Sequence, residues 1–287
     1  MQTVTTTPAL RQAVEDLRIN HDGARQTVAL VPTMGALHDG HLTLVRAAKE
    51  KADHVVASIF VNPRQFGKGE DLDAYPRQLA ADSAKLEAEG VALLWAPGVE
   101  AMYPEGYATN VSVSGVSDGL CGADRPGHFD GVATVVCKLF NQVRPDMALF
   151  GEKDWQQLAV IRRMARDLDL SFPAAEAIHG VPTVREADGL AMSSRNAYLS
   201  AEERELAREF PASLKHAVKM ILNGSELWLA KAVAEDDLQL NGIRVDYLEI
   251  VDADTLKPLE KIGDREARII AAVRVGGARL IDNMPVV

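Results

Sequence analysis

Two histidines three residues apart, His38 and His41, are the side chains of this sequence best placed to do chemistry. They follow the apolar run 28–31, which predicts a short buried strand. Pro32 is expected to end that strand because proline cannot donate to a strand ladder. From His41 onward apolar residues recur at helical spacing, and the start of a helix favours anions through its free N–H groups and its dipole. The segment therefore predicts a phosphate-binding corner made of a strand, a loop and a helix.

The histidine pair has other interpretations, which the sequence leaves open. The rings can be solvent-exposed caps of the helix, or one of them can be a hydrogen-bonded residue of the core. A metal pair with Asp39 as third ligand also fits, although Asp39 equally suits the N-cap position of the predicted helix. In the phosphate interpretation the dipole disfavours the charged ring, so a neutral histidine would donate an N–H to the anion.

A second strand-to-helix turn is predicted at 151–157. Asp154 and Gln157 have the spacing of a capping pair, in which case Lys153 is an ordinary surface charge. The alternative is that Lys153 meets a phosphate while Asp154 accepts from a ribose hydroxyl or a helix N–H. In a parallel sheet the ligand crevice lies at the carboxyl ends of the strands, where the strand order switches. We therefore expect both turns at one crevice.

The segment 184–196 is a third candidate, because Ser193, Ser194 and Arg195 place two hydroxyls and a guanidinium in succession. Such a segment can be a mobile loop that binds anions. The alternative is a helix N-cap followed by a surface arginine. Residues 125–129 add a further arginine and histidine ahead of a predicted helix.

Several motifs that would point to other chemistry are missing. The sequence has no GxxxxGK[ST] loop, no GxGxxG after a strand and no HExxH. Gly115–Gly119 fits the GxSxG pattern of serine hydrolases, but a working nucleophile turn needs a strand before it and a helix directly after it. Residues 120–127 have the composition of a loop, which argues against an esterase.

Composition narrows the class of protein. The chain has 287 residues, enough for two domains, and its 31 Lys and Arg against 41 Asp and Glu give a net charge of −10. That balance argues against a broad nucleic-acid-binding face. Cys121 and Cys137 fit neither a disulfide framework nor a metal site and are expected to be buried free thiols. Without a signal peptide or an apolar run of about 20 residues, we expect a cytoplasmic protein with no membrane partner.

The elements that must position these residues alternate between strand and helix. The predicted order, after a helix at 8–19, is strand 28–31, helix 41–52, strand 54–61, helix 76–90, strand 91–95, helix 129–143, strand 147–150 and a helix ending near 168. This alternation predicts an α/β domain with a parallel sheet and right-handed crossovers. Beyond about 183 the pattern changes: a capping box at Ser200–Glu203 and strands at 245–251 and 268–275 indicate a smaller α+β domain.

Nine motifs, in this order, resemble the pantothenate synthetase (pantoate–β-alanine ligase) family over nearly the whole chain. They are Pro32–His41, Ile59–Phe66, Asp71–Leu72, Tyr75–Arg77, Arg125–Phe129, Lys138–Asn141, Phe150–Gln157, Val184–Asn196 and Arg279–Asn283. The segments around His41 and Ser193 are also similar to the HIGH and KMSKS signatures of a wider nucleotidyltransferase superfamily. Each motif alone is weakly to moderately specific, but the ordered set is very specific.

The resemblance implies a Rossmann-like catalytic domain at 1–183, an α+β lid domain at 184–287 and a homodimer. It implies an ATP-dependent ligase that activates pantoate as an adenylate and passes it to β-alanine. His38, His41, Lys153 and Arg195 are the implied catalytic residues. The implied ATP-binding residues are Met34, Gly35, Ala36, Leu37, His38, Asp39, Gly40, His41, Gly151, Glu152, Lys153, Asp154, Val184, Met192, Ser193, Ser194 and Arg195. Gln65 is implied to hold pantoate and β-alanine, Gln157 to hold pantoate, and Asp82 to bind Mg²⁺ with the ATP phosphates.

Two rival functions remain open at this point. A different nucleotidyltransferase of the same fold would transfer adenylyl to a phosphorylated substrate. Such a substrate would call for additional Arg or Lys, whereas Gln65 and Gln157 suit an uncharged hydroxyl handle. A regulatory module that binds nucleotide without catalysis would bind ATP without releasing pyrophosphate, and it gives His38 and His41 no purpose.

Overall fold

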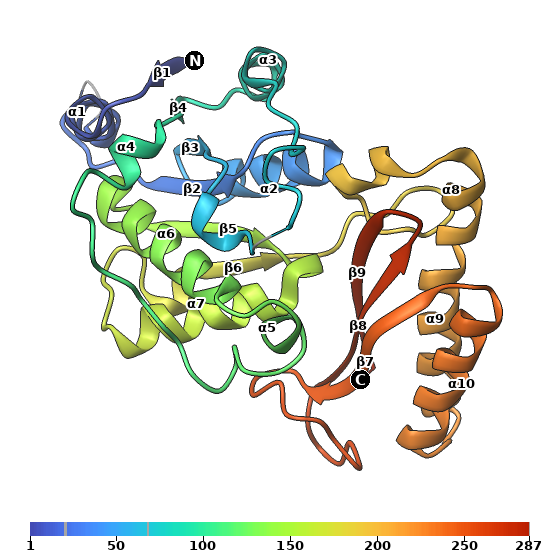
Figure 1. Cartoon of the computed structure of the whole chain (residues 1–287). Coiled ribbons are helices and arrows are strands. Elements are labelled where there is room, and N and C mark those ends of the chain that lie inside the picture. Colours follow the sequence, from blue (N-terminus) through green and yellow to red (C-terminus); the bar gives the residue numbers. More distant parts are fainter. Residues whose placement is uncertain (20–21, 68, 287) are drawn as a thin grey trace. The chain divides into compact units, whose positions relative to one another are not determined.

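The computed structural model describes residues 1–19, 22–67 and 69–286, and the chain divides into two compact units (Figure 1). The first unit contains Met1–Val113, Arg125–Glu152 and Gln157–Pro182, and the second contains Ser114–Asp124, Lys153–Gln156 and Thr183–Val287. Two short segments inside the expected first domain thus group with the second unit.

The first unit is built on a six-stranded sheet in the order β1-β4-β3-β2-β5-β6, in which all pairs are parallel. The strands are β1 (Gln2–Val4), β2 (Val28–Thr33), β3 (His54–Ile59), β4 (Leu93–Trp95), β5 (Met147–Gly151) and β6 (Ile178–Val181). The predicted Rossmann-like α/β architecture is confirmed. One detail was wrong, because β2 continues through Pro32. Proline removes a single donor, and the ladder resumes at Thr33, whose carbonyl accepts from the N–H of Phe60 at 3.0 Å.

Helices cover both faces of this sheet. Side chains alternate along a strand, and Ala29 and Val31 of β2 share a buried cluster with Leu44 and Val45 of α2 (Asp39–Lys49). The other face of β2 meets α1 (Thr7–Arg18) and α6 (His128–Val143), which also pack on each other. Burial on both faces explains why these strands read as continuous apolar runs. The other helices of at least ten residues that belong wholly or mostly to this unit are α3 (Leu79–Ala88) and α7 (Trp155–Asp167).

The second unit is a smaller α+β structure, as expected. Its antiparallel sheet contains β7 (Arg244–Asp252), β8 (Ala267–Val275) and β9 (Ala278–Pro285), and its helices include α8 (Ala201–Ala207), α9 (Glu209–Leu222) and α10 (Leu227–Leu240). In Figure 1, α9 and α10 run side by side, and they bury one apolar cluster with the three strands. The predicted capping box is confirmed, since the hydroxyl of Ser200 accepts from the N–H of Glu203. Among the described residues of the whole chain, no helix is both long and apolar enough to cross a bilayer.

Candidate active site

The strand order of the first unit switches direction at β2 and β5. From β2 the chain moves to β3 and β4 on one side, whereas β5 and β6 lie on the other. The loop after β2, residues 34–38, and the end of β5 at Gly151 with Glu152 therefore lie at the position where parallel sheets hold ligands. Both segments are among those that the family resemblance implies to bind ATP.

The loop after β2 is held from behind by a buried carboxylate. Gly35 and Ala36 have positive φ values of 87° and 51°, which turn the backbone sharply. Asp82 on α3 is fully buried and accepts from the N–H groups of Ala36 at 2.8 Å and Leu37 at 2.9 Å. Lys85 donates to the carbonyl of Leu37. This placement argues against Asp82 as a Mg²⁺ ligand, because both of its oxygens already serve the loop.

The same contacts change how the corner can bind a phosphate. The N–H groups of Ala36 and Leu37 face Asp82, so they do not form a cradle for an anion. The donors left for a phosphate at this corner are those at the start of α2. His38, and not Asp39, is the N-cap residue of that helix, and Asp39 pairs with Arg46 at 2.9 Å.

His38 and His41 lie against each other, with ring centroids 4.1 Å apart and ring planes at 41°. The N–H of His38 donates to Nδ1 of His41 at 3.4 Å. Because a backbone N–H can only donate, Nδ1 of His41 must accept, so the proton of a neutral His41 ring is on Nε2. His41 is thereby prepared as an Nε2–H donor, as the phosphate interpretation requires.

Gln65 has an orientation fixed by a chain of obligate donors and acceptors. Asn62, which is 1% exposed, donates from Nδ2 to the carbonyl of Gly131 at 3.0 Å and to Oε1 of Gln65 at 3.1 Å. Its Oδ1 accepts from the N–H of Arg64 at 3.3 Å and from the hydroxyl of Tyr103 at 2.8 Å. Burial raises the pKa of Tyr103, which keeps that hydroxyl protonated. The carbonyl of Gly131 can only accept and the backbone N–H of Arg64 can only donate, so the Asn62 amide must be oriented in this way.

The consequence for Gln65 is that its oxygen points toward Asn62 and its NH₂ group points away. Nε2 lies 3.0 Å from the sulfur of Met34, in the loop after β2. A thioether is a weak acceptor, so the NH₂ group can serve an oxygen of a ligand. The structure thus brings Gln65 and Met34 together.

The turn that carries Gln65, η1 (Pro63–Gln65), docks on α6 through a glycine. A Cβ at Gly131 would lie 2.3 Å from the carbonyl oxygen of Arg64 and 2.7 Å from Cα of Gln65. No side chain fits in that space. Gly131 is therefore required for the close approach of the turn to the helix, a role that left no signal in the sequence.

The backbone of Gln65 is also held from the 125–129 segment. Its carbonyl lies 2.8 Å from Nδ1 of His128 and accepts from the guanidinium of Arg125 at 3.2 Å. Arg125 in turn pairs with Glu70. Burial opposes ionisation of Glu70, but the hydrogen bonds from Arg125 outweigh it and hold the pKa of Glu70 below its usual value. The arginine and histidine noted in the sequence thus position Gln65.

The two adjacent glutamines of the 151–157 turn have different surroundings. Gln157 is half-buried on α7, where the prediction for pantoate remains to be tested. Gln156 is buried in the second unit and bonds the N–H of Cys121 and the carbonyls of Val116 and Gly119. It holds the GxSxG segment as a loop. The described residues just before that segment form no strand, so the hydrolase geometry is absent.

In the second unit, the 184–196 loop is tied to β9. Arg185 pairs with Asp282 through two bonds of 2.6 and 2.9 Å, and the Asp282 side chain is fully buried. The N–H of Met192 donates to the carbonyl of Val184 at 3.0 Å, which closes the loop. The hydroxyl of Ser193 accepts from the N–H of Arg195 at 3.2 Å, so the capping interpretation holds for Ser193. Ser194 and Arg195 open the short helix η4 (Ser194–Tyr198).

Lys153 and its neighbours are anchored in the same unit. Asn283 of β9 donates to the carbonyl of Lys153 at 2.9 Å, and the indole N–H of Trp155 donates to the carbonyl of Ala253 at 2.8 Å. The ring of Trp155 also stacks against Arg268, 3.7 Å from its guanidinium carbon. Within the second unit, the closing motif Arg279–Asn283 therefore supports both Lys153 and the 184–196 loop.

Comparison with known proteins fits this arrangement. A sequence model of the Pantoate-beta-alanine ligase family matches residues 2–285. The chain belongs to the pantoate–β-alanine ligase family. Among its relatives, the pantothenate synthetase of Novosphingobium aromaticivorans is 63% identical, with 100% of this chain and 99% of the relative covered.

Solved structures of the ligase family share the fold. A pantothenate synthetase from Thermus thermophilus matches at a TM-score of 0.92 and 50% identity, covering 100% of this chain and 99% of that one. A pantoate–β-alanine ligase from Francisella tularensis, crystallised with β-γ ATP and β-alanine, matches at a TM-score of 0.80 and 30% identity, covering 100% and 98%. The resemblance inferred from the motifs is confirmed.

Proposed function

We propose that this chain is an ATP-dependent ligase that condenses pantoate with β-alanine to pantothenate through a pantoyl adenylate, releasing AMP and pyrophosphate. The observation that carries the proposal is membership of the pantoate–β-alanine ligase family over residues 2–285. The geometry supports it, because the fixed NH₂ group of Gln65 is an uncharged donor suited to a carboxylate or hydroxyl of pantoate. A phosphorylated substrate would call for a cation at that place.

The first step must make pantoate a good acyl donor. One carboxylate oxygen attacks the α-phosphorus of ATP, the bond to the bridging oxygen breaks, and pyrophosphate leaves. Gln65 and Gln157 orient pantoate, and the Nε2–H of His41 stabilises the charge that grows on the phosphates. Lys153, Ser194 and Arg195 supply further donors to the triphosphate, with the remaining residues predicted for ATP around the nucleotide.

Mg²⁺ enters this scheme as the complex with ATP. Among the described residues no three His, Cys, Asp or Glu side chains gather as a metal site, and Asp82 is occupied by the loop after β2. We therefore expect Mg²⁺ to arrive with ATP, where it would help to stabilise the charge on the phosphates. In the second step the amine of β-alanine attacks the acyl carbon, loses a proton, and AMP leaves with one oxygen that came from pantoate.

Isotope transfer tests the proposal directly. With pantoate labelled by ¹⁸O in its carboxylate, we expect one labelled oxygen in AMP and pyrophosphate release that depends on pantoate. Unlabelled AMP would exclude the adenylate, and pyrophosphate release with other hydroxy acids at the same rate would exclude pantoate as the substrate. ATP binding with no pyrophosphate release would favour the regulatory module.

We further propose that the protein works in the cytoplasm as a homodimer. Cys121 and Cys137 are both free thiols, which fits a reducing compartment. The homodimer is proposed on the family resemblance alone, and the cysteines do not bear on it. Analytical ultracentrifugation at micromolar concentration should give about twice the chain mass of 31.1 kDa, and a single species of that mass itself would refute the dimer.

A further inference from the structure

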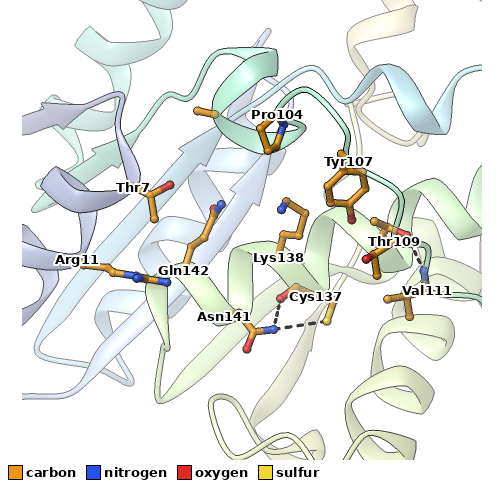
Figure 2. A pocket seen from close by; sticks show the side chains of 12 residues that line it. Thr7, Arg11, Pro104, Tyr107, Thr109, Val111, Cys137, Lys138, Asn141 and Gln142 are labelled. Atoms are coloured by element: carbon orange, nitrogen blue, oxygen red, sulfur yellow. Dashed lines mark hydrogen bonds between the residues drawn. The ribbon is translucent and has the colours of Figure 1, made fainter.

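A cavity of about 480 Å³ lies in the first unit, where α1, α6 and the segment around α4 (Val99–Met102) meet (Figure 2). Its volume falls in the range of small-molecule sites, about 300–1,000 Å³. Lys138, which contributes to the lining, stands seven residues beyond Gly131 on α6, about 10 Å along the helix axis. The residues predicted for ATP, pantoate and β-alanine do not contribute to its lining.

The lining has a charge opposite to that of the chain. It includes Arg11 and Lys138 and, among the described residues, no Asp or Glu, although the chain carries ten more acidic than basic residues. Neither Arg11 nor Lys138 forms an ion pair with a described carboxylate. Lys138 lies over the ring of Tyr107, 4.8 Å from its centroid, so its ammonium is placed at the cavity. Two cations that pair with no carboxylate in the described part of the chain favour an anion here.

Gln142 adds a buried donor of fixed direction. It is 8% exposed, and its Oε1 accepts from the indole N–H of Trp95 at 3.1 Å. An indole N–H can only donate, so the NH₂ group of Gln142 is the end left for the cavity. Figure 2 shows Gln142 and Lys138 extending to the same side of α6, between Thr7 and Tyr107. Thr7 adds a hydroxyl from the first turn of α1.

The rest of the lining is apolar or neutral. Ala101, Pro104, Val111 and the ring of Tyr107 form much of the wall. Burial raises the pKa of Cys137, so its thiol is neutral, and Asn141 turns its amide toward the carbonyl and sulfur of Cys137. A ligand that fits this wall has an apolar or aromatic body in addition to its charge.

From this combination we propose that the cavity binds a small organic anion, a carboxylate or phosphate carried on an apolar body, at a site separate from the candidate active site. The anion lies between Arg11, Lys138 and the NH₂ group of Gln142. The apolar body lies against Tyr107 and Val111. The proposal does not depend on the function proposed above.

Titration of the isotope-labelled full-length protein, followed by amide chemical shifts, tests the site. The probes are phenyl phosphate and phenylacetate. Two compounds serve as comparisons: phenol, which lacks the negative charge, and inorganic phosphate, which lacks the apolar group. We expect at least one of the organic anions to shift the amides of Thr7, Tyr107 and Asn141 with a Kd below about 1 mM. Phenol and inorganic phosphate should bind at least tenfold more weakly.

Matched variants separate a charge site from a merely apolar hollow. Arg11→Met and Lys138→Met should each weaken binding about tenfold, whereas Lys219→Met, an exposed lysine of α9, should leave it unchanged. The proposal would be overturned if phenol bound with the same affinity as the organic anions. It would also be overturned if both cavity variants bound the anions with wild-type affinity. The proposal would also be overturned if the chemical shifts of the cavity amides changed with protein concentration and not with the probes. The cavity would then be an interface between two copies of this chain.

Discussion

The side-chain NH₂ group of Asn62 donates to the amide oxygen of Gln65 at 3.1 Å, and this bond fixes which end of the Gln65 amide points away from Asn62. In Asn62→Asp the donor becomes an oxygen, which repels Oε1 of Gln65 and the carbonyl of Gly131. We expect Gln65 to turn over and present its oxygen to pantoate. The KM for pantoate should rise about 10- to 100-fold in steady-state assays, with the KM for ATP little changed.

A double-mutant cycle checks this mechanism. In a Gln65→Ala background, Asn62→Asp should add little to the KM for pantoate, because the group it reorients is gone. Equal effects of Asn62→Asp in both backgrounds would show that Asn62 acts without Gln65.

Gly131→Ala should lower activity because it displaces the turn that carries Gln65. The new Cβ would stand 2.3 Å from the carbonyl oxygen of Arg64, so the turn that carries Gln65 has to move. A displacement of about 1 Å at a substrate-binding group can cost about 100-fold in kcat/KM, which steady-state kinetics will measure. Gly119→Ala is the control, since a Cβ there meets nothing within 4 Å. Similar kcat/KM values for the two variants would contradict the docking role of Gly131.

His41→Ala should slow adenylate formation by about 10²–10³, the usual effect of removing one donor to developing charge. Because Nδ1 accepts from the N–H of His38, the acting donor is Nε2–H. His41→Gln, which keeps a side-chain N–H at a similar reach, should recover part of the rate. Pantoate-dependent pyrophosphate release measures both variants, and wild-type rates for His41→Ala would remove His41 from the mechanism.

Lys153→Ala separates the two interpretations of the 151–157 turn. The backbone of Lys153 is held by Asn283, and this bond survives the substitution. If Lys153 contacts phosphate, pyrophosphate release should fall about 10²–10³ while the melting temperature stays within a few degrees. Normal turnover with a lowered melting temperature would support the surface-charge interpretation instead.

The ionised Asp146 side chain should make the free energy of unfolding fall at low pH. Burial opposes its ionisation, but the N–H of Val28 and the guanidinium groups of Arg18 and Arg25 outweigh it and hold the pKa of Asp146 below its usual value. The unfolded-state pKa is about 3.9, so the stabilisation is complete above that pH and is lost as the pH falls through the folded-state pKa.

Asp146→Asn should therefore lower the free energy of unfolding by about 1–3 kcal/mol at pH 7. The difference from the wild-type chain should shrink as the pH falls below about 4, because Asp146 of the unfolded chain takes up a proton first, and it should vanish once the pH is below the folded-state pKa as well. Urea unfolding followed by circular dichroism at pH 7 and pH 3 measures both. A difference that is the same at the two pH values would show that the charge of Asp146 contributes nothing.

Strands with continuous apolar runs were predictable, because burial on both faces leaves a plain signal in β2 and β3. Three strands were missed for physical reasons. β1 has three residues, β6 contains His179 and Gly180, and β9 carries Arg279, Asp282 and Asn283, whose polar groups are partnered within the second unit. Sequence spacing cannot reveal a partner that is far along the chain.

The same limit explains what was missed in the candidate site. The types and spacing of His38 and His41 indicated binding chemistry, and the family resemblance pointed to Gln65. The contact of Asp82 with a loop 46 residues away left no local pattern. Asn62 looked like the polar end of a strand, and its Asn-Pro pair was the only signal available. Gly131 looked like an ordinary helical glycine, because its role depends on a backbone 67 residues earlier in the chain.

Helix α6 carries Gly131 near its start and Lys138 and Gln142 further along, on a single stretch of sixteen residues. A ligand bound against Lys138 and Gln142 would therefore contact the same helix on which the turn of Gln65 packs. If an anion binds in the proposed cavity, one helix would connect it to the turn that carries Gln65.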